Sequence, residues 1–179
     1  MKFIETEIAG LYLIKPSKFE DSRGTFIKTF HLETLEKHGL KGDFKEGFFS
    51  TSKKDVLRGM HFQTPPHDHE KLVYVPNGSI LDVVLDIRKD SPTYGKYVSQ
   101  TLSAENGYIF YVPTGCAHGF LSLEDNTNVT YMQTTMYADG HDGGLNYDSF
   151  GFDWNIKNPI ITDKDKELVL FSDFETPFN

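Results

Sequence analysis

Residues 107–118 read Gly-Tyr-Ile-Phe-Tyr-Val-Pro-Thr-Gly-Cys-Ala-His, and the fold class follows more from this stretch than from any other. The β-branched and aromatic residues between Gly107 and Pro113 favour a short strand. Pro113 and Gly115 are typical of a tight turn, and residues 117–121 then predict a second strand. The stretch therefore predicts two short strands joined by a turn, with a histidine at the start of the second strand.

The sequence on either side repeats this pattern of short strands and turns. Residues 79–88 alternate, with Leu81 and Val83 on one face and Asp82 and Asp86 on the other, which predicts a half-buried strand. Strands this short indicate an all-β sandwich or barrel. Further elements are expected as strands at 71–75, 97–102, 108–112 and 128–137, a helix at 31–38 that Gly39 ends, and a capped turn at 162–165.

The composition fits one domain and excludes several classes of protein. A chain of 179 residues with 38% apolar and 14% aromatic residues can bury a full core, so residues 1–179 are expected to form a single domain. A single cysteine, Cys116, excludes an internal disulfide and a cysteine-based zinc site. A net charge of −8 argues against nucleic acid as a partner. Without an apolar leader or a long apolar run, the chain is expected to be cytoplasmic and not to enter a membrane.

The opening stretch also matches a known motif. Gly107, Pro113, Gly115 and His118 occupy the fixed positions of the second cupin motif, G-x5-P-x-G-x2-H. The resemblance to cupins implies a double-stranded β-helix, or jelly-roll barrel, with a few short helices.

The first cupin motif is altered in a way that bears on metal binding. Metal-binding cupins carry a glutamate seven residues before the glycine that ends the strand; here that glycine is Gly78, and the earlier position is Lys71. Because a cation repels a metal ion, the sequence predicts that side chains replace metal chemistry, with no metal site and no cofactor.

Several runs together resemble one cupin family, the RmlC family of dTDP-4-dehydrorhamnose 3,5-epimerases and their relatives. The most specific is Val-Leu-Arg-Gly-Met-His-Phe-Gln at 56–63, followed by Lys-Leu-Val at 71–73. Because the matches keep their order over nearly the whole chain, they are more specific than a lone motif. The other matches are 19–26, 86–93, 102–106, 117–121, Tyr131, Tyr137 and the pair Lys164 and Asp165.

The resemblance implies epimerisation of a nucleotide-linked 4-keto-6-deoxyhexose at C3, C5 or both, where the hydrogens flank a carbonyl group. His61 is implied as the base, oriented by Asp165, because histidine is neutral near pH 7 and accepts a proton readily. Lys71 would stabilise the enolate, and Tyr131 would donate a proton on the opposite face. The implied pathway is the biosynthesis of deoxysugars for surface polysaccharides.

The resemblance also implies residues that bind the nucleotide sugar. Arg58 and Arg23 would hold the diphosphate, since guanidinium pairs with phosphate in a bidentate manner. Tyr137 would stack on the nucleotide base, and its even spacing from Tyr131 on one predicted strand places both on one face. The remaining candidates for substrate binding are Phe19, Phe26, Gln63, His118, Asp142, Lys164, Glu46 and Phe48.

Two features of the resemblance concern geometry and assembly. Arg58 and His61 have opposite parity on one strand, so both can face the pocket only if a β-bulge lies at Gly59, which we predict. The family exchanges its N-terminal strand within a homodimer, so residues 19–28 are expected to serve the partner's pocket.

The chain departs from the family around the substrate more than around the reacting groups. Glu46 and Phe48 stand where the family has glutamine and asparagine, and His69 stands where it has glutamine. The identity of the nucleotide base and of the inverted carbon therefore remains open. Alternatives are a mono-epimerase or keto-isomerase acting on a CDP- or GDP-sugar, a metal-dependent cupin that uses His67, His69 and His118, and a sugar-nucleotide binding module without activity.

Overall fold

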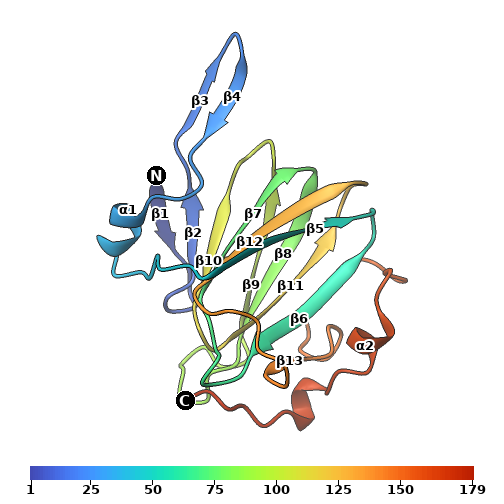
Figure 1. Ribbon diagram of the computed structural model, residues 1–179. Helices are drawn as coiled ribbons and strands as arrows, with labels where there is room; N and C mark the ends of the chain where they lie inside the picture. The colour runs from blue at the N-terminus through green and yellow to red at the C-terminus, as the bar shows by residue number, and fades with distance from the viewer.

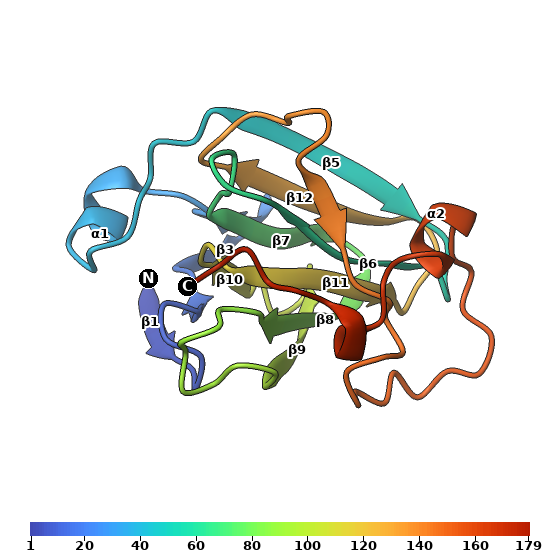
Figure 2. The same ribbon diagram turned by 90° about the horizontal axis from the view of Figure 1, so that it is seen from below.

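The computed structural model describes residues 1–179, and its two antiparallel sheets face each other (Figures 1 and 2). The first sheet has the order β1 (Lys2–Glu5), β2 (Tyr12–Lys15), β10 (Ile109–Val112), β7 (Lys71–Asn77), β12 (Thr127–Gln133), β5 (Glu46–Ser52). The second has the order β13 (Asp142–Gly144), β6 (Leu57–Gln63), β11 (Cys116–Ser122), β8 (Ser79–Asp86), β9 (Tyr97–Ser103). The all-β prediction is confirmed.

The other elements are short and lie around the two sheets. The strands β3 (Lys18–Asp21) and β4 (Gly24–Ile27) pair as a hairpin that extends away from the body of the molecule (Figure 1). The helices are α1 (Leu32–Glu36), α2 (Asp163–Lys166) and the 3-10 turn η1 (Phe171–Asp173). No helix is long and apolar enough to cross a membrane.

Strand β8 is buried on both faces, and this corrects the prediction for residues 79–88. Between the sheets, Ile80 and Val84 of β8 pack in the central core cluster. On the outer face, Val83 and Leu85 pack against the C-terminal segment that carries Trp154. The alternation in β8 thus separates two buried environments instead of a core face and a solvent face.

Two predicted elements are shorter in the structure than in the sequence reading. Helix α1 spans five residues, and His31, its N-cap, makes no side-chain cap bond. Strand β12 ends at Gln133, so Tyr137 lies in the following loop and not on the strand of Tyr131. The capped turn at 162–165 is confirmed, because the Thr162 side chain accepts a hydrogen bond from the Asp165 backbone N–H at the start of α2.

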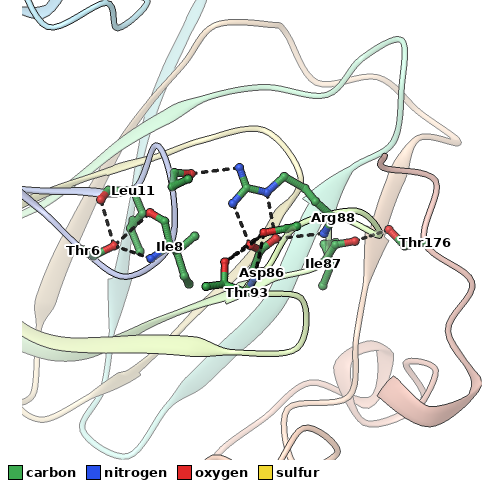
Figure 3. A network of polar contacts seen from close by, with 10 residues as sticks. Thr6, Ile8, Leu11, Asp86, Ile87, Arg88, Thr93 and Thr176 are labelled. Atoms are coloured by element: carbon green, nitrogen blue, oxygen red, sulfur yellow. Dashed lines mark hydrogen bonds and ion pairs between the residues drawn. The ribbon is translucent and has the colours of Figure 1, made fainter.

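A polar network anchors the loop that follows β8 (Figure 3). Asp86 is fully buried and accepts hydrogen bonds from Arg88, Ser91 and Thr93. Burial alone would raise the pKa of Asp86, but these hydrogen bonds hold it below its usual range. A charged carboxylate is tolerated here because each of its oxygens is hydrogen-bonded.

Candidate active site

A cavity of about 520 Å³ opens between the two sheets, a volume typical of small-molecule sites. Outside the segment 19–26, every residue that the sequence predicts for the site lines it. Those residues are Glu46, Phe48, Arg58, His61, Gln63, Lys71, His118, Tyr131, Tyr137, Asp142, Lys164 and Asp165.

The predicted bulge at Gly59 is confirmed. On β6, His61 pairs with His118 and Arg58 pairs with Phe120, so two residues of β6 oppose the single residue Gly119 of β11. Gly59 has a φ of +129°, and a Cβ there would lie 2.5 Å from the Gly119 Cα, so only glycine fits. The bulge turns both Arg58 and His61 toward the cavity.

His61 is oriented by a carboxylate from the C-terminal segment. The His61 Nε2 lies 2.8 Å from Asp165 Oδ1, and the His61 side chain is 36% exposed. Burial works to raise the pKa of Asp165, but the His61 hydrogen bond and the Gly59 N–H together keep it below its usual range. An ionised Asp165 only accepts hydrogen bonds, so Nε2 carries the hydrogen and the other ring nitrogen is free to take a proton.

A second histidine–carboxylate pair lies at the same site: His118 lines the cavity, and Asp82 lies behind it. The His118 Nε2 is 2.5 Å from Asp82 Oδ1, and both side chains are buried. Burial raises the pKa of Asp82, and the charge and hydrogen bond of His118 oppose that shift only in part. The sequence reading assigned Asp82 to a solvent-facing side of β8 and therefore missed it. An acidic residue within an otherwise apolar strand was the available signal.

Lys71 and Tyr131 come from the opposite sheet and are both buried. Lys71 is 5% exposed, and burial lowers the pKa of its ammonium to about 8, although nearby Asp82 and Asp142 favour the charged form. Burial also raises the pKa of the Tyr131 phenol, with a further contribution from the charge of Asp82. At neutral pH the site thus presents an ammonium and a protonated phenol.

Gln63 lines the cavity, but its amide holds the walls together. Its Nε2 donates to the carbonyl oxygens of His67 and Met136, at 2.8 and 3.2 Å, and its Oε1 accepts from the Ala138 N–H. These bonds fix the loop that carries Tyr137 beside the cavity mouth. Gln63 thus also positions this loop, and its role in substrate binding stays a prediction.

The rim of the cavity is charged and aromatic. Lys164 Nζ lies 2.6 Å from Asp142 Oδ2, which raises the pKa of Lys164. Glu46 Oε2 accepts a hydrogen bond of 2.8 Å from the Tyr137 N–H. Arg58 donates through Nε to Ser52, which leaves its terminal nitrogens at the cavity.

Buried polar atoms without a partner gather at this site. In the whole protein they are Ser50 Oγ, His69 Nε2 and Asp82 Oδ2. Ser50 and His69 line the cavity, and Asp82 bonds to His118, which also lines it. Because such atoms are costly to bury, their gathering in one place is typical of a functional site.

The predicted residues Phe19, Arg23 and Phe26 do not reach this cavity. They lie on the β3–β4 hairpin, where both phenylalanines are 61% exposed and Arg23 pairs with Asp21.

The histidines of the metal-cupin alternative do not form a metal site. No three His, Cys, Asp or Glu side chains are placed to hold a metal ion. The rings of His67 and His141 contact each other at a tilt outside the cavity lining. Burial, with a further contribution from the charge of Lys71, lowers the pKa of the His69 imidazole to about 3. A buried ammonium at this place disfavours a bound cation.

Comparisons with known proteins place the chain in a family. The model of the family described as dTDP-4-dehydrorhamnose 3,5-epimerase matches residues 5–173. The chain belongs to this family. The dTDP-4-dehydrorhamnose 3,5-epimerase of Shigella flexneri is 39% identical over 168 residues, which cover 92% of this chain and 93% of that protein. Members of the family are isomerases that act on nucleotide sugars.

Solved structures of the epimerase family share the fold. The enzyme from Sulfolobus tokodaii superposes with a TM-score of 0.92 at 41% identity and covers 100% of both chains. The Legionella pneumophila enzyme, solved in complex with dTDP-4-keto-L-rhamnose, has a TM-score of 0.92 at 34% identity and covers 97% of this chain and 94% of its own. The predicted cupin-type barrel of the RmlC family is thereby confirmed.

Proposed function

We propose that this chain inverts C3 and C5 of a dTDP-linked 4-keto-6-deoxyhexose, in the biosynthesis of a deoxysugar. The observation that carries the proposal is the set of reacting groups on two facing sheets. His61, held by Asp165, comes from one sheet, and Tyr131 and Lys71 come from the other. The names of the related enzymes support the nucleotide and the two carbons.

In the proposed reaction, His61 breaks the C–H bond beside the carbonyl group and takes the proton. The electron pair moves to the carbonyl oxygen, where the Lys71 ammonium stabilises the enolate. The Tyr131 phenol then forms a new C–H bond on the opposite face. Solvent removes the proton from His61 and returns one to Tyr131, so the atoms of the sugar are unchanged and only the configuration differs.

The substrate is proposed to lie along the cavity toward its charged rim. Arg58 and Lys164 supply positive charge for the diphosphate, and the ring of Tyr137 at the mouth is placed to stack on the base. This arrangement directs the sugar toward His61 and Lys71 and away from the rim.

We also propose a homodimer, in which the β3–β4 hairpin reaches the partner's cavity. The exposed rings of Phe19 and Phe26 lie 6.3 Å apart on this hairpin, which extends from the body of the molecule (Figure 1). Exposed aromatic pairs of this kind are favoured at interfaces. Sedimentation that gives a monomer would contradict this arrangement. A cytoplasmic location is proposed on the basis of the substrate, because nucleotide sugars are made there.

The first experiment is deuterium incorporation. The protein is incubated in D2O with 4-keto-6-deoxyhexoses linked to dTDP, CDP or GDP, and C3 and C5 are examined by mass spectrometry and NMR. Label at both carbons of the dTDP sugar is expected. Label at one carbon would indicate a mono-epimerase, and absence of label on every substrate would overturn the proposal.

A matched variant separates proton removal from inversion. Tyr131→Phe lacks the donor but retains the ring, so deuterium exchange is expected to continue while net inversion falls by about 100-fold or more. Loss of both in equal proportion would contradict the role of Tyr131 as the acid.

A further inference from the structure

Strand β5 presents one face to the cavity, and residues on that face contact Tyr131 and Tyr137. Glu46, Phe48 and Ser50 are two residues apart, so they point the same way, and all three line the cavity. Glu46 accepts a hydrogen bond from the backbone of Tyr137, as described above. Phe48 stands directly opposite Tyr131 in the pairing of β5 with β12.

This pairing places two aromatic rings face to face. The rings of Phe48 and Tyr131 have centroids 4.9 Å apart and an interplanar angle of 19°. The imidazole of His118 meets the same tyrosine edge-on, with centroids 6.0 Å apart at 72°. Tyr131 is therefore fixed by a stacked ring on one side and a perpendicular ring on another.

Phe48 itself is not part of the packed interior. It is 44% exposed and belongs to none of the three core clusters, whereas Tyr131 belongs to the central one. Its ring therefore contributes little to the core, and its main contact of defined geometry is the stack on Tyr131.

We infer that Phe48 is a positioning residue for Tyr131: its ring holds the phenol in the plane from which a proton reaches the enolate on the face opposite His61. The inference rests on the proposed epimerase function. An enolate formed by His61 has two fates, since His61 can return a proton to the same face or Tyr131 can deliver one to the other. A fixed phenol favours delivery and raises the fraction of enolates that are inverted.

The experiment measures inversion per exchange event in D2O with the dTDP-linked 4-keto-6-deoxyhexose. Phe48→Leu keeps an apolar side chain but removes the stack, and the ratio of inversion to exchange is expected to fall about tenfold. Phe48→Tyr restores an aromatic ring and is expected to recover most of the ratio. Phe49→Leu is the matched control, because Phe49 is the next residue on the strand, is 68% exposed and does not line the cavity.

A second measurement detects the stack of Phe48 on Tyr131 independently of enzyme activity. Ring-proton NMR signals of Tyr131, assigned by their loss in Tyr131→Phe, are expected to move downfield in Phe48→Leu and to stay near the wild-type positions in Phe49→Leu. An unchanged ratio of inversion to exchange in Phe48→Leu would overturn the inference, as would an equal loss of both rates. Absence of exchange in the wild-type protein would overturn the proposed function instead, so the two failures are distinguishable.

Discussion

Two histidine–carboxylate pairs lie at the cavity, and their carboxyl groups shift in opposite ways. His61 and Asp165 lie at the accessible end, where the histidine is 36% exposed. His118 and Asp82 lie at the inner end, where the side chains are 3% and 0% exposed. The pKa of Asp165 lies below its usual range, whereas burial raises the pKa of Asp82 above it.

The difference shows that burial decides what such a pair can do. Asp165 receives a backbone N–H from Gly59 as well as the histidine, so it remains ionised and can stabilise a charged imidazole. Asp82 has one oxygen without a partner and is fully desolvated. The outer pair is therefore suited to take up a proton, and the inner pair is suited to shape the electrostatic field around Lys71 and Tyr131.

The largest expected effect separates the two histidines. His61→Asn is expected to slow deuterium exchange by about 1,000-fold or more, because it removes the general base. His118→Asn, the matched variant in the inner pair, is expected to slow exchange by about tenfold at most, because the imidazole is buried and bonded to Asp82. Single-turnover exchange in D2O measures both. Faster exchange in His61→Asn than in His118→Asn would reverse the assignment.

A smaller effect concerns the pH dependence. Burial lowers the pKa of Lys71 to about 8, so kcat/KM is expected to fall as pH rises through about 8 and the ammonium loses its charge. The charge of Asp82 raises that pKa, so Asp82→Asn is expected to move the fall to lower pH.

The matched control is Asp165→Asn, which reduces activity but is expected to leave the position of this fall unchanged. Lys71→Arg keeps its charge at every pH used, so the fall is expected to disappear in any activity that remains. A fall at the same pH in the wild type and in Lys71→Arg would show that another group titrates there.

The residues brought to the cavity were largely predictable, since short-range patterns and the family resemblance locate them. His61, Lys71 and Asp165 lie on separate elements, yet each occurs in a specific run of sequence. The bulge at Gly59 was also predictable, because two inward-facing side chains of opposite parity require it.

The errors share a physical cause, which is contact between elements distant in sequence. Asp82 was assigned to solvent because the other face of β8, with Val83 and Leu85, is the more apolar one. That face is covered by a segment far along the chain, and Asp82 shares the face between the sheets with Ile80 and Val84. Tyr137 was predicted on a strand, but it lies in a loop. That loop is held by a hydrogen bond from the Ala138 N–H to Gln63, which is 75 positions away, and a local sequence pattern does not show such a contact. Residues 19–26 do not line the cavity of their own chain, and their expected role in a partner's pocket stays a prediction.

The smallest expected effect is on stability, and it has opposite signs for the two carboxylates. A carboxyl group whose pKa is raised on folding stabilises the fold below its unfolded pKa and loses that contribution as pH rises. Burial makes ionisation of Asp82 costly, so Asp82→Asn is expected to stabilise the protein by about 1 kcal/mol, or about 2–4 °C in Tm. Asp165 has a lowered pKa and contributes stability above its unfolded value, so Asp165→Asn is expected to destabilise by about 1 kcal/mol. Scanning calorimetry over a range of pH tests the signs: the gain in Asp82→Asn is expected to grow as pH rises, because the pKa of Asp82 is raised, and the loss in Asp165→Asn is expected to shrink only at acidic pH, because the pKa of Asp165 is lowered. Equal losses in Tm for both variants would show that the inner pair stabilises the fold, and that burial is not what distinguishes it from the outer one.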